Sequence, residues 1–323
     1  MVQRTKKQHV VPRFYLEKFC DSDGFVWTHT AGTIPRGLLP EATAVETNFY
    51  SPIGANGERY DGIEKLLGIF ESGAAPLWGA VSQGEVLSGE NREKFALFLA
   101  AQYLRSPAIV RAGAEMAGLL FHHIGQVTAA NKEVHDKSVD SYEAKTGAKI
   151  TAEQRIKMRD FISNPNNFTI NVLRYAGLPM LGSIGNLADI FLSMKWIVGR
   201  SIDQHFITSD SPVTRTSDPA THNRVYGDGA FANKTVRVHF PLSPDRILEM
   251  TWQGEERTRV VEIPKEVARK MNGLCAALAE RFLYACKSDS GISKLCNKWL
   301  DGQKAQKVSI GRETPKIAVK RKL

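Results

Sequence analysis

The chain has 323 residues, 42% of them apolar, and a formal net charge of +9. This length and composition are typical of a globular protein with one large domain or two smaller ones, and they exclude low-complexity and collagen-like chains. The longest uncharged apolar run, 95–101, is far shorter than the roughly 20 residues of a membrane-spanning helix. The start of the chain has no apolar signal-peptide segment, and the four cysteines have no disulfide or metal-binding spacing. We therefore expect a soluble cytoplasmic protein with no membrane partner.

The positive charge is concentrated near the two ends of the sequence. Residues 1–7 contribute +3 and residues 303–323 contribute +6, so residues 8–302 are neutral overall. The absence of net charge in residues 8–302 gives no sign of the broad positive groove that many nucleic-acid-binding proteins have. The basic tail, 303–323, either captures a nucleic acid through its phosphates or is a flexible, solvated segment.

Helical spacing of apolar residues dominates the first two thirds of the chain. A short helix is expected to begin at Pro12, where the fixed backbone angle of proline suits a first helical position, and a short strand is expected at 24–28. Longer helices are expected after that, at 60–78, 90–104, 109–130, 151–162 and 168–192.

Beyond residue 193 the pattern changes to short runs of β-branched and aromatic residues separated by turns. Strands are expected at 195–199, 205–208, 235–240, 247–252 and 258–263. Helices are expected again at 264–286 and 292–300. The sequence thus predicts an α+β fold: one composite domain over 1–302, with a helical part at about 41–192, a small antiparallel sheet at 193–263, closing helices at 264–302 and a flexible tail at 303–323.

The segment around Pro12 places an imidazole, a guanidinium and a phenol beside an apolar stripe. His9 and Arg13 are expected to flank the entrance of the short helix, which would project Tyr15 and Phe19 together. This arrangement is typical of the edge of a site.

Two carboxylates are expected on one face of the helix at 60–78. Glu64, Gly68 and Glu71 lie within about 60° of one another around the helix axis, beside a buried apolar stripe. Such carboxylates hold a divalent cation or act as acid and base, and the alternative is a solvated helix face.

The next helix carries Phe98, Gln102 and Arg105 on one face, so its apolar stripe ends in an amide and a guanidinium. A buried guanidinium requires a carboxylate partner, because an unpaired buried charge costs several kcal/mol. Glu64, Glu71 and Asp210 are the candidates. Arg105 is then either a substrate-binding residue or part of a structural ion pair.

Asp210 and Glu46 are two further acidic candidates. Asp210 follows an apolar strand in the segment 206–213 and either lines a pocket or forms a simple turn with its own downstream amides. Glu46 lies on a short extended segment whose alternation places it on the same side as Asn48 and Tyr50.

Five motifs together resemble those of the bacterial domain-of-unknown-function family 4238. They are His9-x-x-Pro12-x-Phe14-Tyr15-Leu16-x-x-Phe19, Glu46-x-x-Phe49-Tyr50, Ile63-Glu64 followed by Glu71, Gln102-x-x-Arg105-Ser106-Pro107, and Phe206-x-Thr208-Ser209-Asp210-x-Pro212. The resemblance extends from about residue 6 to about residue 287. It implies a bacterial or phage-related origin and a single family-wide domain, and it brings no activity, cofactor or catalytic residue with it.

Two functions fit these residues. The first is a metal-dependent phosphoesterase or nuclease acting on nucleic acid, in which carboxylates hold Mg²⁺ or Mn²⁺, an arginine stabilises phosphate and His9 transfers a proton. Its expected metal ligands are Glu46, Glu64, Glu71 and Asp210. Its expected catalytic groups are His9, Arg13, Gln102 and Arg105.

The second function is a non-catalytic sensor or binding module, in a toxin or phage-defence setting, whose polar cluster locks the helices to the sheet. It predicts a saturated network with little water. The enzyme predicts instead a cavity open to solvent, lined by His9 and at least two carboxylates, with room for a metal ion.

Overall fold

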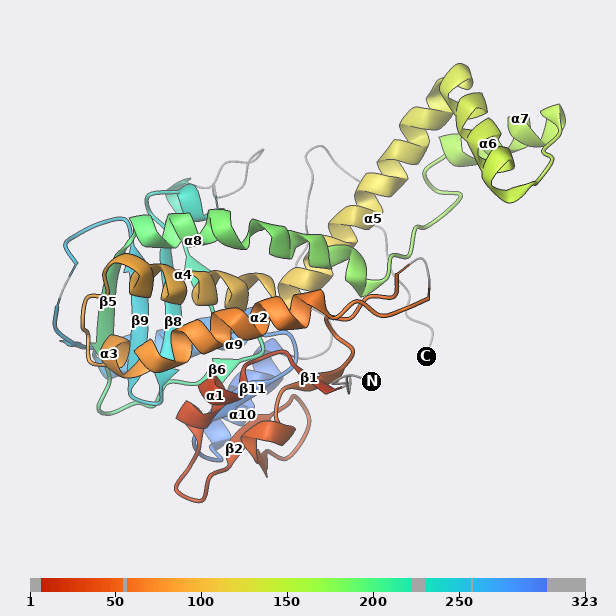
Figure 1. The fold of residues 1–323 in the computed structure, drawn as a ribbon. Helices are drawn as coiled ribbons and strands as arrows, with labels where there is room; N and C mark the ends of the chain where they lie inside the picture. Colours follow the sequence, from red (N-terminus) through yellow and green to blue (C-terminus); the bar gives the residue numbers. More distant parts are fainter. Residues whose placement is uncertain (1–6, 55–56, 222–229, 257, 301–323) are drawn as a thin grey trace. The chain divides into compact units, whose positions relative to one another are not determined.

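The structure is a computed structural model that describes residues 7–54, 57–221, 230–256 and 258–300 (Figure 1). The chain divides into two compact units, a larger one formed by Met1–Val110 with Pro179–Leu323 and a smaller one formed by Arg111–Leu178. Helices and mainly antiparallel sheets confirm the predicted α+β class. The basic tail at 303–323 lies outside the described residues.

The larger unit is built around a five-stranded sheet with the order β10-β5-β9-β8-β7. Neighbouring strands are antiparallel, except that β10 runs parallel to β5. The strands are β5 (Lys195–Arg200), β7 (Thr214–Thr216), β8 (Arg237–Ser243), β9 (Arg246–Thr251) and β10 (Val261–Glu262).

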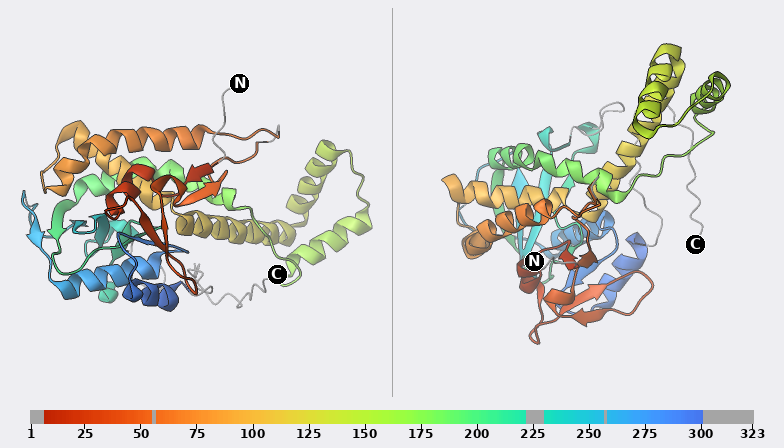
Figure 2. Two further views of the ribbon diagram at one scale, coloured as in Figure 1. Left: turned by 90° about the horizontal axis from the view of Figure 1, so that it is seen from below. Right: turned by 45° about the vertical axis from the view of Figure 1, so that its right-hand side comes forward.

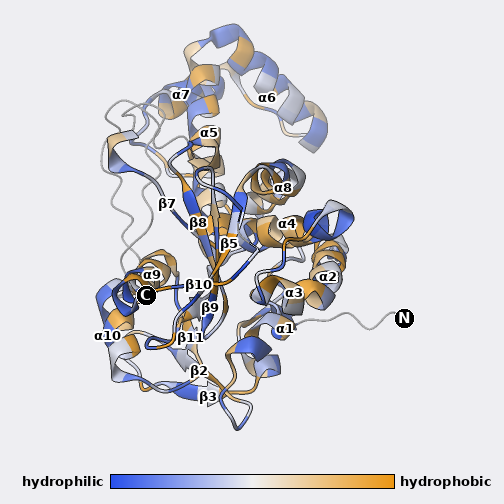
Figure 3. Cartoon of the chain, turned by 90° about the vertical axis from the view of Figure 1, so that its left-hand side faces the viewer, coloured by the Kyte–Doolittle hydropathy of each residue, from blue (hydrophilic) through white to orange (hydrophobic). Residues whose placement is uncertain are grey.

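Helices cover both faces of this sheet, as Figure 3 shows. One face packs against a layer made of α2 (Gly62–Ala74), α3 (Trp78–Ser82), α4 (Gly89–Leu104) and α8 (Ile184–Ser193). On that face Phe240 contacts the rings of Trp78 and Phe98. On the other face Ile247 packs against Ala268 of α9 (Lys265–Leu278). Alternate residues of the strands thus supply two apolar surfaces, which is the origin of the core.

A second sheet joins strands near the N-terminus to a strand near the C-terminal end of the described residues. Its order is β3-β2-β11-β6, with all pairs antiparallel. Figure 2 shows the N-terminal strands, drawn in red, beside the blue C-terminal segment. The last helix, α10 (Ser290–Trp299), packs its Ile292 and Cys296 into the cluster that contains Leu283. The strands are β2 (Val26–His29), β3 (Arg36–Leu38), β6 (Thr208–Ser209) and β11 (Leu283–Ala285).

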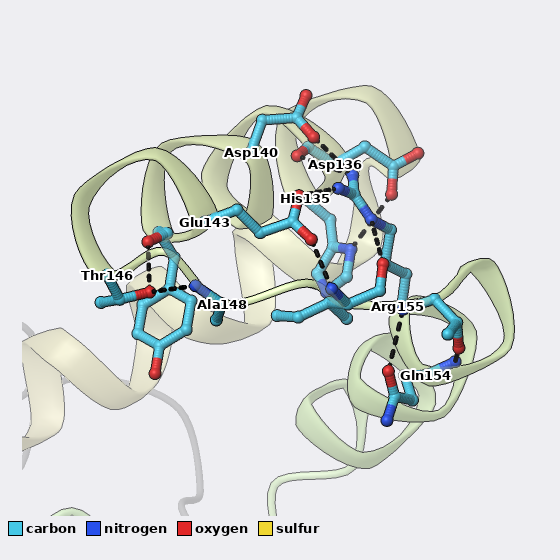
Figure 4. Close-up of polar contacts among 11 residues, drawn as sticks. His135, Asp136, Asp140, Glu143, Thr146, Ala148, Gln154 and Arg155 are labelled. Atoms are coloured by element: carbon cyan, nitrogen blue, oxygen red, sulfur yellow. Dashed lines mark hydrogen bonds and ion pairs between the residues drawn. The ribbon is translucent and has the colours of Figure 1, made fainter.

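The smaller unit contains most of α5 (Pro107–Ala130), followed by α6 (Lys132–Thr146) and α7 (Ala152–Ser163). Thr151 and Gln154 form a capping box at the start of α7. Arg155 of α7 makes ion pairs with Asp140 at 2.6 Å and Glu143 at 2.5 Å, both on α6 (Figure 4). These ion pairs connect α7 to α6. The charged side chains gathered here therefore have a structural role, which is to hold the two helices together.

Three predicted helices are wrong in extent. The helix expected at 60–78 ends as α2 at Ala74, and a 3₁₀ helix, Ala75–Leu77, separates it from α3. The segment expected as one helix at 168–192 contains a 3₁₀ helix, Arg174–Ser183, before α8, because Pro179 and neighbouring glycines oppose a continuous α-helix. The helix expected at 264–286 ends at Leu278, and the chain then forms β11. Helix α6 was not predicted, because its exposed, charged surface lacks an apolar stripe.

Within the described ranges, no helix combines the length and the apolar character that crossing a bilayer requires.

Candidate functional site

Arg105 lies at the C-terminal end of α4, where the chain turns toward α5. The buried face of α4 includes Phe98 and Gln102 and leads directly to Arg105, as helical spacing predicts. The backbone N–H of Arg105 donates to the carbonyl of Ala101 and closes the last turn. Its side chain is only 2% exposed, so the helix delivers a guanidinium into the interior of the larger unit.

Three protein oxygens accept hydrogen bonds from this guanidinium. Nη1 donates to Oε1 of Glu71 on α2, and Nη2 donates to the backbone carbonyl of His9 at the end of β1 (Lys7–His9), both at 2.5 Å. Nε donates to the hydroxyl of Tyr50 at 3.3 Å, and that hydroxyl donates to the carbonyl of Arg105 at 3.0 Å. We call Arg105, Glu71, Tyr50, His9 and the adjacent Glu64 the Arg105 cluster.

Burial sets the electrostatics of the Arg105 cluster. It raises the pKa of Glu64. The charge of Arg105 lowers this pKa, and the charge of Glu71 raises it further. Burial lowers the pKa of His9, although the Pro40 carbonyl and Glu71 act in the other direction. Burial also disfavours a charged guanidinium, but Tyr50 and Glu71 more than compensate and raise the pKa of Arg105. The shifts thus stabilise the charged form of Arg105 and disfavour the charged forms of Glu64 and His9 relative to exposed side chains.

Asp210 lies apart from this cluster. Its carboxylate accepts three backbone N–H groups, from Glu280 at 2.8 Å, Arg281 at 2.7 Å and Phe282 at 3.1 Å. The side chain is buried, so it ties the turn after β6 to the turn after α9. We expected the Asp210 carboxylate either to line a pocket or to accept N–H groups just after it in the sequence. It accepts N–H groups about 70 positions away instead.

The other expected site residues have separate surroundings. Glu46 of β4 (Val45–Thr47) lies 3.7 Å from Arg281, and exposed Arg13 pairs with Glu17 one helical turn away. Gln102 is 1% exposed, and neither its amide oxygen nor its amide nitrogen has a hydrogen-bond partner among the described residues. None of these three joins the hydrogen bonds of Arg105.

The four expected metal ligands do not form a common site. Glu64 and Glu71 belong to the Arg105 cluster, Asp210 is held by backbone N–H groups and Glu46 faces Arg281. Nowhere in the part of the chain that the structure describes do three His, Cys, Asp or Glu side chains come together so that they could hold a metal ion. Oxygen ligands that converge on the ion are what a Mg²⁺ or Mn²⁺ site in a phosphoester-cleaving enzyme supplies.

A cavity of about 190 Å³ lies elsewhere in the larger unit. The turn between α4 and α5 contributes Ser106 and the first turn of α5 contributes Ala108. The turn after β6 contributes Ser211, β7 contributes Arg215 and α9 contributes its last residue, Leu278. Sequence reasoning missed this cavity, because its walls come from segments that only the fold brings together.

A cysteine and a histidine far apart in the sequence also meet. Sγ of Cys286 lies 3.3 Å from Nδ1 of His205, although 81 positions separate them. Burial raises the pKa of the Cys286 thiol. Burial thus disfavours the thiolate form of Cys286.

Comparison with known proteins identifies the family of the chain. No curated protein and no solved structure matches it. Residues 7–289 match DUF4238, which is described as a protein of unknown function. This stretch contains the Arg105 cluster, Asp210 and the cavity. The chain therefore belongs to the DUF4238 family, as its motifs predict.

Proposed function

We propose that this protein is a non-catalytic binding module in which the Arg105 cluster is structural. The observation that carries the proposal is that each of the three nitrogens of the guanidinium already donates to a protein oxygen. An arginine that binds phosphate offers its nitrogens as a two-pronged fork. In this protein the carboxylate of Glu71 occupies Nη1 and the carbonyl of His9 occupies Nη2. The bonded guanidinium therefore fits the internal network of a binding module better than a catalytic phosphate site, and Oε2 of Glu64 is a buried oxygen of the cluster without a hydrogen-bond partner among the described residues.

Two further observations support this choice over a metal-dependent phosphoesterase. The expected acidic ligands are divided between the Arg105 cluster, which holds Glu64 and Glu71, and the surroundings of Arg281, which contacts both Asp210 and Glu46. The cavity has different walls, because none of the eight expected site residues lines it. Under this proposal, the cavity would bind the ligand and the Arg105 cluster would stabilise the fold, and different residues would carry the two roles.

Glu71→Gln separates the two functions. Purified full-length protein is expected to leave RNA, single-stranded DNA and duplex DNA intact, with or without Mn²⁺. The variant is expected to unfold at a lower temperature, because a neutral amide replaces the carboxylate that balances a buried guanidinium. The measurements are gel assays of each substrate and thermal unfolding of both proteins, in the presence and absence of Mn²⁺.

Glu93→Gln is the matched control for this test. Glu93 is an exposed carboxylate on the same helix as Gln102, so its substitution should leave the unfolding temperature unchanged. Cleavage that requires Mn²⁺ and disappears in Glu71→Gln, with the unfolding temperature unaltered, would refute the proposal.

Binding of nucleic acid through residues 303–323 is a separate proposal, supported by their net charge of +6. Deleting these residues is expected to weaken binding to duplex DNA and to flatten its dependence on salt, by about 0.9 in the log–log slope for each phosphate that is no longer neutralised. Equal affinity and equal slope for the full-length and shortened chains would rule out the tail as a nucleic-acid-binding segment.

A further inference from the structure

We infer that the smaller unit binds a second copy of this chain through an exposed apolar stripe on α5, so that the protein associates into a two-fold symmetric dimer. The α5 stripe consists of Met116, Leu120, Ile124 and Val127. None of these four residues belongs to the Arg105 cluster or lines the cavity, so the role of the stripe is independent of the proposed function.

The four side chains of the α5 stripe lie on one side of the helix. At about 100° per residue they fall within about 80° of one another around the helix axis. Each is exposed, as is the neighbouring Phe121, with exposed fractions between 45% and 58%. Such spacing is typical of a helix that packs against a partner, yet in the described part of the smaller unit this side of α5 faces solvent.

The packing of α5 inside the smaller unit uses the opposite side of the helix. A Cβ at Gly118 would lie 3.4 Å from the carbonyl oxygen of Ile170, and a Cβ at Gly125 would lie 3.5 Å from the side chain of Ile162. The segment 162–170 thus lies close against that side. The stripe is therefore a second apolar side of the same helix, and the described residues of the unit leave it about half exposed.

The charge distribution favours a second copy of the chain as the partner. Residues 116–130 contain no Lys, Arg, Asp or Glu, whereas α6 and α7 of the same unit are rich in charged residues. Two copies of the stripe are therefore compatible, because no like charges meet when the same surface is used twice.

Two other partners fit the stripe less well. A helix that lies on a membrane surface carries lysines and arginines beside its apolar face, and residues 116–130 have none. The basic tail, 303–323, would bring its net charge of +6 to a stripe that contains no acidic residue.

The area of the stripe matches that of a small, reversible dimer interface. A fully accessible side chain of this size exposes roughly 150–200 Å², so the half-exposed stripe and Phe121 leave about 400–500 Å² of apolar surface on each copy. His123 and Ala130 are also exposed on this side of α5 and extend the area. Two copies together then bury about 1,000 Å², the lower limit of specific interfaces. We therefore expect a dissociation constant in the micromolar range.

The test measures the mass of the full-length protein by sedimentation equilibrium at about 1–100 µM, a range that brackets the expected dissociation constant. The wild type is expected to shift from monomer to dimer across this range. Its unfolding temperature is expected to rise with protein concentration, because association stabilises the folded state by mass action.

Leu120→Glu and Ile124→Glu assign the dimer to the α5 stripe. Each places two carboxylates, one from each copy, in an apolar interface, so the dissociation constant is expected to rise at least about tenfold. Both positions are exposed, so circular dichroism should show an unchanged fold. Ile69→Glu is the matched control. Ile69 is an exposed apolar residue of α2 in the larger unit, and its substitution should leave the dissociation constant unchanged.

A wild type that stays monomeric up to about 100 µM would overturn this inference, as would a dimer that both Leu120→Glu and Ile124→Glu leave intact. Association that appears only after deletion of 303–323 would also overturn it and would identify the tail as the partner of the stripe. Binding to vesicles of phosphatidylcholine and phosphatidylserine that Leu120→Glu abolishes would replace the dimer with a membrane surface. Metal-dependent cleavage that is lost in Glu71→Gln would instead overturn the proposed function and leave the dimer unaffected.

Discussion

Arg105→Ala is expected to lower the free energy of unfolding by about 4 kcal/mol, the largest effect among the substitutions considered for this protein. The substitution leaves a cavity where one of the largest fully buried side chains stood. It also strands the carboxylate of Glu71 and the hydroxyl of Tyr50. For a unit of this size the unfolding temperature should fall by about 10 °C, as measured by calorimetry or circular dichroism.

Arg13→Ala is the control, because that arginine pairs with Glu17 on the surface and should contribute no more than about 0.5 kcal/mol. A double-mutant cycle adds a sharper test. Arg105→Met alone leaves Glu71 without its counter-charge, whereas Arg105→Met combined with Glu71→Leu removes both charges. The double variant should therefore be more stable than Arg105→Met. Additive losses would contradict the structural role assigned to this ion pair.

Asp210→Ala is expected to cost about 3 kcal/mol at about pH 5, because three backbone N–H groups of Glu280–Phe282 lose their acceptor inside the protein. Burial raises the pKa of Asp210 from its ordinary value of 3.8 to about 6, against the effect of these N–H groups. Chemical denaturation at several pH values measures both the loss and its pH dependence.

The sign of this pH dependence follows from the raised pKa of Asp210. Between about pH 4 and pH 6 the folded protein holds a proton that the unfolded chain has released, so the wild type loses stability as the pH rises through this window. The cost of Asp210→Ala should therefore be about 1 kcal/mol smaller at about pH 7.5 than at about pH 5. A cost that does not change with pH would contradict the raised pKa.

Asp21→Ala provides the comparison for Asp210→Ala. Asp21 also accepts three N–H groups, from Asp23, Phe25 and the Trp27 ring, but it does so near the surface. Water can replace its carboxylate there, so the destabilisation should be smaller. An equal destabilisation would show that burial is not what makes Asp210 important.

Regular patterns allowed much of the fold to be predicted from the sequence. The apolar periodicity of 90–104 and the β-branched run at 195–199 correspond closely to α4 and β5. The apolar periodicity continues past two points where the regular α-helix does not. At Pro179 the proline opposes an α-helix. At Leu278 helix α9 ends, and the chain then forms β11, which pairs with β2. The spacing of apolar residues indicates which face of an element is buried. It gives no information on strand partners that lie far away in the chain.

The candidate site was predictable only in part. The expectation that buried Arg105 needs a carboxylate is confirmed by Glu71, because that argument uses the cost of an unpaired charge and no knowledge of topology. The separation of Asp210 from this pair could not be anticipated, since its acceptor role depends on the turn at 280–282. The cavity beside Ser211 was hidden for the same reason.

The pairing of β2 with β11 has a consequence for biosynthesis. Val26–His29 leaves the ribosome early, yet its partner Leu283–Ala285 is among the last described segments to be made. Closing this sheet therefore joins residues more than 250 positions apart, and such non-local pairing slows folding. During translation the edge of the hairpin formed by β2 and β3 therefore has no β11 to pair with until residues 283–285 have been made.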